Sequence, residues 1–329
     1  MSKKSQNKIV NFLVQIVRVV VGALFIFSGF VKLVDPIGSQ YKFEEYFSEG
    51  VLNLEFLIPY ALFLAIFLVI SEVVLGVALL VGWRPKFTVG SLKIMILIFL
   101  FLTWYSAYFN KVTDCGCFGD AIKLTPWQTF YKDVILTVLI FFLGTKHSYL
   151  TPIKKTKIPF FITLGSLVIS SLITYYVLYH LPIIDFRAYK IGTNISEGMK
   201  YKGDGKIPPI HDFMLEDEQN DLAPEILKMD KVVLFISYSL EKSEFEAFPL
   251  VKEFALNAKK KGYTVFGASA SFSDAIQLTK KKYNLPFEFL FCDETTLKTM
   301  IRSNPGIIIL KKGIIENKKN WRDIDDIEL

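Results

Sequence analysis

The sequence predicts an α-helical membrane bundle followed by a soluble α/β domain, and three observations support this fold class. Hydrophobic residues make up 52% of the 329 residues, and the mean hydropathy is +0.37, which is too apolar for one ordinary soluble domain. Five apolar runs reach the ~20 helical residues that cross a bilayer, and they lie near 9–31, 57–82, 92–109, 127–144 and 158–180. Beyond Pro182 the composition becomes that of a soluble protein.

These runs divide the chain into four expected parts. A four-helix transmembrane domain covers 1–150, a fifth transmembrane helix 151–181, a connector 182–206 and a soluble domain 207–329. The first run begins like a signal peptide, but its apolar core is long and no small-x-small cleavage site follows. We therefore expect a retained anchor.

Positive charges orient the bundle, because short cytoplasmic loops carry the excess of Lys and Arg. The amino-terminal segment and the second-to-third and fourth-to-fifth connections hold most of the positive charges: Lys3, Lys4, Lys8, Arg84, Lys86, Lys93, Lys146, Lys154, Lys155 and Lys157. This pattern predicts a multi-pass membrane protein with its amino terminus in the cytoplasm and its carboxy-terminal domain on the far side of the membrane. In a bacterium, where we expect the protein in the inner membrane, that far side is the periplasm. These charges account for the net charge of +6, so the bilayer is an expected partner and nucleic acid is not.

The segment DCGCFGD at 114–120 contains Cys115 and Cys117, and Cys292 is the third cysteine. All three would lie in the oxidising periplasm. A Cys115–Cys117 bridge would close a ring of three residues, for which the chain-entropy model gives about 1.6 kcal/mol, against about 3 kcal/mol for a 15-residue loop. A strained, exposed bridge of this kind stabilises little and exchanges readily. The sequence therefore favours a redox-active pair.

Other interpretations of the cysteine loop remain open. Asp114 and Asp120 flank the pair, and negative charge disfavours a thiolate, so the loop would serve better as a disulfide under attack than as an attacking thiol. The cysteines could also simply shape the loop. Soft-metal binding is a third alternative, with His211 as a further ligand, but two thiolates alone lack the ligands that zinc requires, and we expect no metal site.

A helix start follows the loop at Thr125-Pro126-Trp127-Gln128. Thr125 can cap the helix, Pro126 suits its first position, and Gln128 completes a capping box. The positive end of this helix would lower a thiol pKa if the loop folded back over it.

Charged residues inside the apolar runs need a partner or a wet cavity. Arg18 and Glu72 fall at similar depth when each is counted from the cytoplasmic end of its run, and we expect them to form an intramembrane ion pair. That pair would either fix the packing of two helices or serve as a proton or ligand site. Asp133, near the outer end of the fourth run, is expected beneath the cysteine loop.

Alternating patterns after residue 206 predict the soluble α/β domain. We expect a strand and turn at HDFMLEDEQN and strands at KVVLFISY, YTVFGASA and FEFLFCD. Helices are predicted over 243–261, 273–283 and 294–303. The last segment, NPGIIILKKGII, is predicted to form a strand pair that turns at Lys312-Gly313. Pro305 opens a strand after a helix and is a candidate cis proline.

This order of elements resembles the thioredoxin fold, in its TlpA-like and peroxiredoxin-like branch, over about 207–329. In that family a Cys-x-x-Cys follows the first central strand, where this chain has SYSLEKSEF and no cysteine. The resemblance implies that Pro305 borders a groove for substrate peptides. Cys292 does not occupy the family's catalytic position, and it is either a resolving thiol or a small buried residue at a strand end.

The first 150 residues resemble the DoxX and MauE membrane families. The resemblance lies in GALFIFSGFVKLVDP at 22–36, in SEVVLGVALLVGWRPK at 71–86, and above all in CGCFGD at 115–120 with TPWQTFYKD downstream. It implies a four-helix membrane bundle, and the MauE branch is associated with disulfide handling or with the maturation of periplasmic redox proteins. By this resemblance Cys115 and Cys117 are the redox candidates.

Three functional hypotheses follow. The leading one is an inner-membrane thiol–disulfide oxidoreductase or maturation factor that uses the Cys115/Cys117 pair. Its electrons would pass to a membrane quinone or to a soluble thiol protein. A periplasmic client would dock on the thioredoxin-like domain. The main competitor is a non-catalytic scaffold whose soluble domain binds a periplasmic partner. The weakest is a small-molecule carrier built on Arg18 and Glu72, since no inverted repeat is visible.

Overall fold

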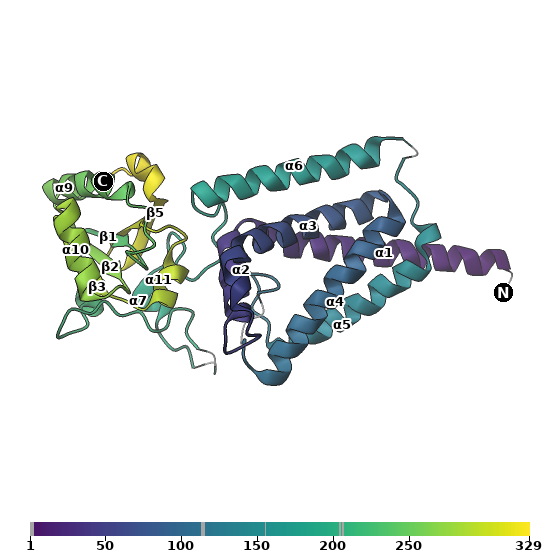
Figure 1. The fold of residues 1–329 in the computed structure, drawn as a ribbon, viewed down its shortest axis with the longest axis horizontal. Coiled ribbons are helices and arrows are strands. Elements are labelled where there is room, and N and C mark those ends of the chain that lie inside the picture. Colours follow the sequence, from purple (N-terminus) through teal and green to yellow (C-terminus); the bar gives the residue numbers. More distant parts are fainter. Residues whose placement is uncertain (1–2, 113–115, 155, 204, 206) are drawn as a thin grey trace. The chain divides into compact units, whose positions relative to one another are not determined.

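The computed structural model describes residues 3–112, 116–154, 156–203, 205 and 207–329, and it divides the chain into two compact units, Met1–Leu178 and Tyr179–Leu329. Figure 1 shows the long helices of the first unit and the mixed sheet of the second.

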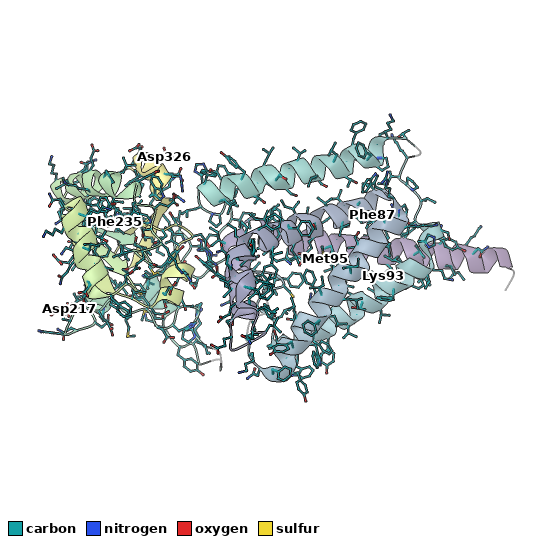
Figure 2. The ribbon with its side chains drawn as sticks, viewed as in Figure 1. Phe87, Lys93, Met95, Asp217, Phe235 and Asp326 are labelled. Atoms are coloured by element: carbon teal, nitrogen blue, oxygen red, sulfur yellow. The ribbon has the colours of Figure 1, made fainter. Side chains whose placement is uncertain are left out.

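The first unit contains five helices that are long and apolar enough to cross a membrane. They are α1 (Lys3–Leu33), α3 (Ala61–Val81), α4 (Pro85–Phe109), α5 (Pro126–Thr145) and α6 (Ile158–Tyr179). The five predicted runs match these helices, which confirms the predicted membrane bundle. In Figure 1, α1 runs beside α3 and α4 runs beside α5; Figure 2 labels Lys93 and Met95 on α4.

Glycines allow α1 and α3 to pack closely. A Cβ atom on Gly76 would lie 2.9 Å from the carbonyl oxygen of Gly22, which is backbone and cannot move aside. Small residues at such a crossing let two membrane helices approach and gain van der Waals contact. This crossing fixes the register between α1 and α3, and with it the depth of every charged side chain on both helices.

Helix α2 (Pro36–Phe47) was not expected from the sequence. It starts after Asp35, whose side chain accepts a hydrogen bond from the Gly38 backbone N–H at 3.0 Å, and Pro36 occupies its first turn. The Asp-Pro pair is a recognisable helix start, but the following residues are mixed in polarity and show no sustained apolar face. A short 3₁₀ helix (Glu55–Tyr60) then leads into α3.

The second unit is built on a five-stranded sheet in the order β3-β2-β1-β4-β5. The strands are β1 (Val232–Ile236), β2 (Thr264–Ser269), β3 (Glu288–Phe291), β4 (Gly306–Lys311) and β5 (Ile314–Asn320). Strands β1, β2 and β3 are parallel, whereas β4 runs antiparallel to both β1 and β5. The main helices between them are α9 (Ala247–Lys260), α10 (Ser273–Tyr283) and α11 (Glu294–Met300).

Strand β1 lies at the centre of two hydrophobic cores. Its residues are buried on both faces, as expected for a central strand between parallel and antiparallel neighbours. Val232 and Leu234 join the core on one face, and Val233 and Phe235 join the core on the other. Phe235, labelled in Figure 2, stacks on Phe287 with ring centroids 5.1 Å apart.

Two local expectations have clear outcomes. The Asn304–Pro305 peptide bond is cis, which confirms the prediction from Pro305. The predicted strand at 211–220 is wrong, because Glu216 forms only isolated bridges, to Asp221 and to Phe291. Asp217 accepts hydrogen bonds from the backbone N–H groups of residues 219 and 220, so the turn that was predicted with this strand does form.

Residues 185–198, within the expected connector, pack into the second unit. Lys318 of β5 is buried and donates to Asp185 Oδ2 at 2.6 Å, to the Tyr189 carbonyl at 2.8 Å and to the Met300 carbonyl at 2.6 Å. Burial, with the nearby charge of Arg187, lowers the pKa of Lys318 to about 7. Burial would raise the pKa of Asp185, but Arg187 and Lys318 outweigh it and hold that pKa at about 2. This ion cluster attaches the segment before the sheet to β5.

Candidate functional site

The cysteine loop connects α4 to α5, and the structure describes its residues 110–112 and 116–125. Two backbone hydrogen bonds turn it tightly, from Gly119 N–H to the Gly116 carbonyl at 3.0 Å and from Ala121 N–H to the Phe118 carbonyl at 3.2 Å. Cys115 and Asp114 lie outside the described residues, so the predicted Cys115–Cys117 pairing does too. Cys117 is half-buried.

Glycine is required at two positions of the loop. Gly116 and Gly119 have φ angles of 64° and 49°, in the left-handed region that side chains disfavour. A Cβ on Gly116 would lie 3.2 Å from Cγ of Lys42 on α2, and a Cβ on Gly119 would lie 3.1 Å from Cγ1 of Val31 on α1. The glycines of CGCFGD therefore let the loop lie directly on α1 and α2.

The loop is recessed into the bundle. Ser28 Oγ donates to the Cys117 carbonyl at 2.7 Å, and Ser28 precedes Leu33, the last residue of α1, by about 8 Å of helix. The Phe118 ring is buried against Phe27, with centroids 5.6 Å apart. Irregular backbone at such depth is tolerated where protein covers it or where it lines a polar cavity.

Four charged side chains lie beneath this loop. Lys32 of α1 forms a salt bridge with Glu72 of α3, and their side chains are only 7% and 2% exposed. Lys132 of α5 bonds Asp133 Oδ1 at 2.6 Å. Asp133 is fully buried and also accepts from Thr103 Oγ1 of α4 at 3.1 Å. Helices α1, α3, α4 and α5 thus all contribute polar groups to one region.

A cavity of about 20 Å³ joins the loop to these charges, which is room for about one water molecule. Its polar lining comes from Ser28, Lys32, Glu72, Cys117, Lys132 and Asp133. Asp133 therefore lies at the same cavity as the loop cysteine, as the sequence analysis expected. Lys32 and Lys132 were not singled out from the sequence, although TPWQTFYKD contains the Lys132-Asp133 pair inside a predicted membrane run.

The expected Arg18–Glu72 ion pair is wrong. Arg18 is buried, but its guanidinium donates to the Leu79 and Leu80 carbonyls at 2.8 Å and to the Thr151 carbonyl at 3.0 Å. Because the α1–α3 crossing places Arg18 beside the last turn of α3, it lies about 10 Å of helix from Glu72. Arg18 therefore adds hydrogen bonds to carbonyls in the last turn of α3, where backbone acceptors are under-used, and Glu72 pairs with Lys32 instead.

A polar network in the second unit occupies the turn after β1, where SYSLEKSEF stands. Ser237 and Ser243 share a hydrogen bond of 2.9 Å between their hydroxyls, and Ser243 Oγ also donates to Asn304 Oδ1 at 3.3 Å. Asn304 Nδ2 donates to the Ser239 carbonyl at 2.8 Å. The residue before the cis proline Pro305 is thus bonded to the turn after β1 through hydroxyl and amide groups.

The other predicted site residues lie elsewhere. Cys292 is 1% exposed, and burial together with the charge of Asp293 raises its pKa to about 12. At neutral pH this thiol is protonated inside the core. His211 is exposed, with Nδ1 3.3 Å from the Pro208 carbonyl. Within the described parts of the chain, no group of three or more His, Cys, Asp or Glu side chains could hold a metal ion.

Residues 10–146 match the family model of methylamine utilisation protein MauE. This region is a MauE-like domain. The MauE-like domain includes α1 to α5 and the recessed cysteine loop, and it agrees with the family resemblance found in the sequence. Its helices make the chain a multi-pass membrane protein.

Two further proteins are similar to this chain. Protein TlpB of Flavobacterium psychrophilum is 24% identical over 235 residues, which cover 68% of this chain and 55% of that protein. The chain thus spans about half the length of this relative. A solution structure of a thiol:disulfide interchange protein from Bacteroides sp. is 16% identical, with a TM-score of 0.27, and the match covers 32% of this chain and 74% of that one.

The second unit has a thioredoxin-like fold. The arrangement is the one that the sequence predicted: central parallel strands, the antiparallel strands β4 and β5, and a cis proline at the start of β4. The fold class of a membrane bundle followed by a thioredoxin-like domain is therefore confirmed. The MauE-like domain carries the cysteine loop, whereas the thioredoxin-like unit carries serines at the end of β1.

Proposed function

We propose that this chain is a bacterial inner-membrane protein that exchanges disulfides through Cys115 and Cys117 at the periplasmic side of its MauE-like domain. The recessed loop carries the proposal, because it holds Cys117 beside buried lysine and carboxylate side chains. A loop that only joined two helices would not need three buried charges and a partly buried lysine beneath it, since each costs free energy to desolvate. The similarity to TlpB and the thioredoxin-like unit agree with a redox role.

The exchange follows ordinary thiol–disulfide chemistry. A thiolate of a partner dithiol attacks the Cys115–Cys117 bridge, the new bond joins the partner to one loop sulfur, and the other loop sulfur leaves with the electron pair. The partner's second thiol then displaces the loop, so that the partner is oxidised and the loop receives two electrons. A membrane quinone, or the disulfide of a second soluble thiol protein, would accept those electrons in turn and be reduced to the quinol or the dithiol.

The thioredoxin-like unit would dock the client rather than react with it. Its turn after β1 has Ser237 and Ser243 in a closed hydrogen-bond network and no cysteine, and Cys292 is buried. By the family resemblance, a client segment would lie in a groove bordered by Pro305. The redox step thus falls to the MauE-like domain and recognition to the soluble unit.

A second candidate function is a non-catalytic scaffold, which the serine network favours. If the soluble unit only binds a partner, the cysteine loop would merely shape the outer end of the bundle. The two functions differ in one property, which is whether the loop cysteines change redox state in the working protein.

The thiol state of the purified full-length protein decides between them. Alkylation and mass spectrometry across a graded thiol buffer should find a Cys115–Cys117 bridge that titrates reversibly at roughly −120 to −270 mV, the range of exchange proteins. A bridge that resists reduction below about −300 mV would make it structural. Thiols that stay free under oxidising conditions would also favour the scaffold.

A test in cells uses matched cysteine variants. We expect the Cys115→Ser/Cys117→Ser protein to leave periplasmic proteins with altered disulfides, whereas Cys292→Ser should behave as the wild type because that thiol is buried and protonated. Normal periplasmic disulfides in both variants would contradict the redox proposal.

A further inference from the structure

The four charged side chains around the loop cavity form two pairs that differ in their surroundings. The ammonium of Lys32 bonds Glu72 across α1 and α3 and lies 5.1 Å from the centroid of the Phe99 ring. This pair joins two helices, and both partners are almost completely buried. It has the features of a structural ion pair between membrane helices.

Lys132 is different, because its contacts lead toward the cysteine loop. Its Nζ lies 5.0 Å from the centroid of the Phe118 ring, next to Cys117 in the loop, and 2.6 Å from Asp133 on its own helix. Lys132 and Cys117 also line the same cavity. The Lys132 side chain is 20% exposed, so it is partly desolvated while it faces the loop.

The other charged groups around Cys117 come from every packed element. Helix α1 contributes Lys32, α3 contributes Glu72, and α5 contributes Lys132 and Asp133. Lys42 of α2, beside Gly116, is paired with Glu45, and the loop itself carries Asp120. From α4 the cavity receives only the apolar Ile96 and Phe99. Before any thiolate forms, the two cations and two carboxylates of the cavity cancel.

We propose that Lys132 is a positioning residue that provides the positive charge for a Cys117 thiolate when the loop bridge opens. A cation held close in a low-dielectric site favours the charged form of a thiol. It would offset the flanking aspartates, which disfavour a thiolate. The inference rests on the proposed disulfide exchange, because only that reaction releases a sulfur anion here.

The protons and electrons of this step balance. The partner dithiol gives up two electrons and two protons, and the electron pair of the broken S–S bond remains on the loop sulfurs. One proton goes to the Cys115 sulfur, the second goes to solvent water, and the Cys117 sulfur stays anionic beside Lys132. The reduced loop is thus a thiol and a thiolate.

The test measures the reactivity of Cys117 alone. In a full-length protein carrying Cys115→Ser and Cys292→Ser, reconstituted in lipid nanodiscs, the rate of alkylation by iodoacetamide is measured against pH. We expect Lys132→Gln to slow alkylation at neutral pH about tenfold and to move the half-maximal rate to higher pH. Lys132→Arg should retain most of the rate because it keeps the charge.

Two further variants keep the test decisive. Lys123→Gln removes the same charge from an exposed position of the same loop and should leave the rate unchanged. Asp133→Asn removes the carboxylate that competes for Lys132 and should speed alkylation at neutral pH, an effect opposite in sign to that of Lys132→Gln. If both Lys132→Gln and Asp133→Asn match the parent protein, Lys132 is not the counter-charge of Cys117.

The outcome is separable from that of the proposed function. If the alkylation rate of Cys117 depends on Lys132 but the loop bridge never titrates, the electrostatic role of Lys132 is retained and the exchange reaction is removed. If the loop bridge titrates normally but the alkylation rate of Cys117 does not depend on Lys132, the exchange reaction is retained and the electrostatic role of Lys132 is removed.

Discussion

The salt bridge between Lys32 and Glu72 makes a strong energetic prediction. Glu72→Gln would leave the Lys32 ammonium buried and without its counter-charge, since the two side chains are 7% and 2% exposed. Breaking a buried pair by removing one partner costs about 3–5 kcal/mol, whereas replacing both partners with apolar residues of similar size is often neutral or stabilising. We therefore expect Glu72→Gln to destabilise the bundle by about 3 kcal/mol or more, and Lys32→Met/Glu72→Leu to restore most of that loss.

A double-mutant cycle in detergent measures this coupling. Reversible unfolding of the full-length protein is followed by circular dichroism for the wild type, Lys32→Met, Glu72→Leu and the double variant. Arg18→Met combined with Glu72→Leu is the matched control, and we expect those two effects to add, because Arg18 contacts the end of α3 and not Glu72. Strong coupling between Arg18 and Glu72, or additive effects of Lys32 and Glu72, would refute the assigned pairing.

Three other predictions concern the loop, its following helix and the second unit. Gly119→Ala should destabilise the loop by about 1–2 kcal/mol, because its φ of 49° disfavours any side chain, and limited proteolysis at the loop should become faster than in Gly90→Ala, where a Cβ meets open space. Thr125→Ala removes the observed capping box of α5 and should cost about 1 kcal/mol in thermal unfolding, whereas Thr125→Ser should cost little. The pKa of Asp185 is lowered from 3.8 to about 2, so the stabilisation by its carboxylate is present above pH 3.8 and is lost as the pH falls through about 2. The difference in unfolding free energy between the wild type and Asp185→Asn should therefore shrink by about 2 kcal/mol over that range. A difference that does not change with pH would contradict the ion cluster.

Local signals in the sequence were sufficient for most elements of the fold. The predicted helix at 273–283 coincides with α10, Ser273–Tyr283, because its inward-facing residues Ile276, Thr279 and Tyr283 recur at spacings of three and four. The capping box at Thr125 and Gln128 forms as predicted, with hydrogen bonds in both directions. Such features depend on neighbours within four residues, so the sequence determines them directly.

The charged site could not be predicted in the same way, because its partners depend on the register between helices. Counting residues from the ends of apolar runs placed Arg18 level with Glu72. The Gly22–Gly76 crossing instead brings Arg18 to the end of α3 and Lys32 to Glu72. A shift of seven residues corresponds to about 10 Å, which exceeds the reach of any ion pair, and hydropathy alone does not fix an offset of that size.

The contacts of Arg18 bear on how the two parts of this chain came to be joined. One guanidinium holds the end of α3 and the backbone at Thr151, and Ile153 N–H donates to the Val81 carbonyl at 3.1 Å. The bundle therefore closes on itself just before α6 begins, close to residue 146, where the family match ends. These closing contacts involve no residue beyond Ile153, so they do not depend on the helix and domain that follow.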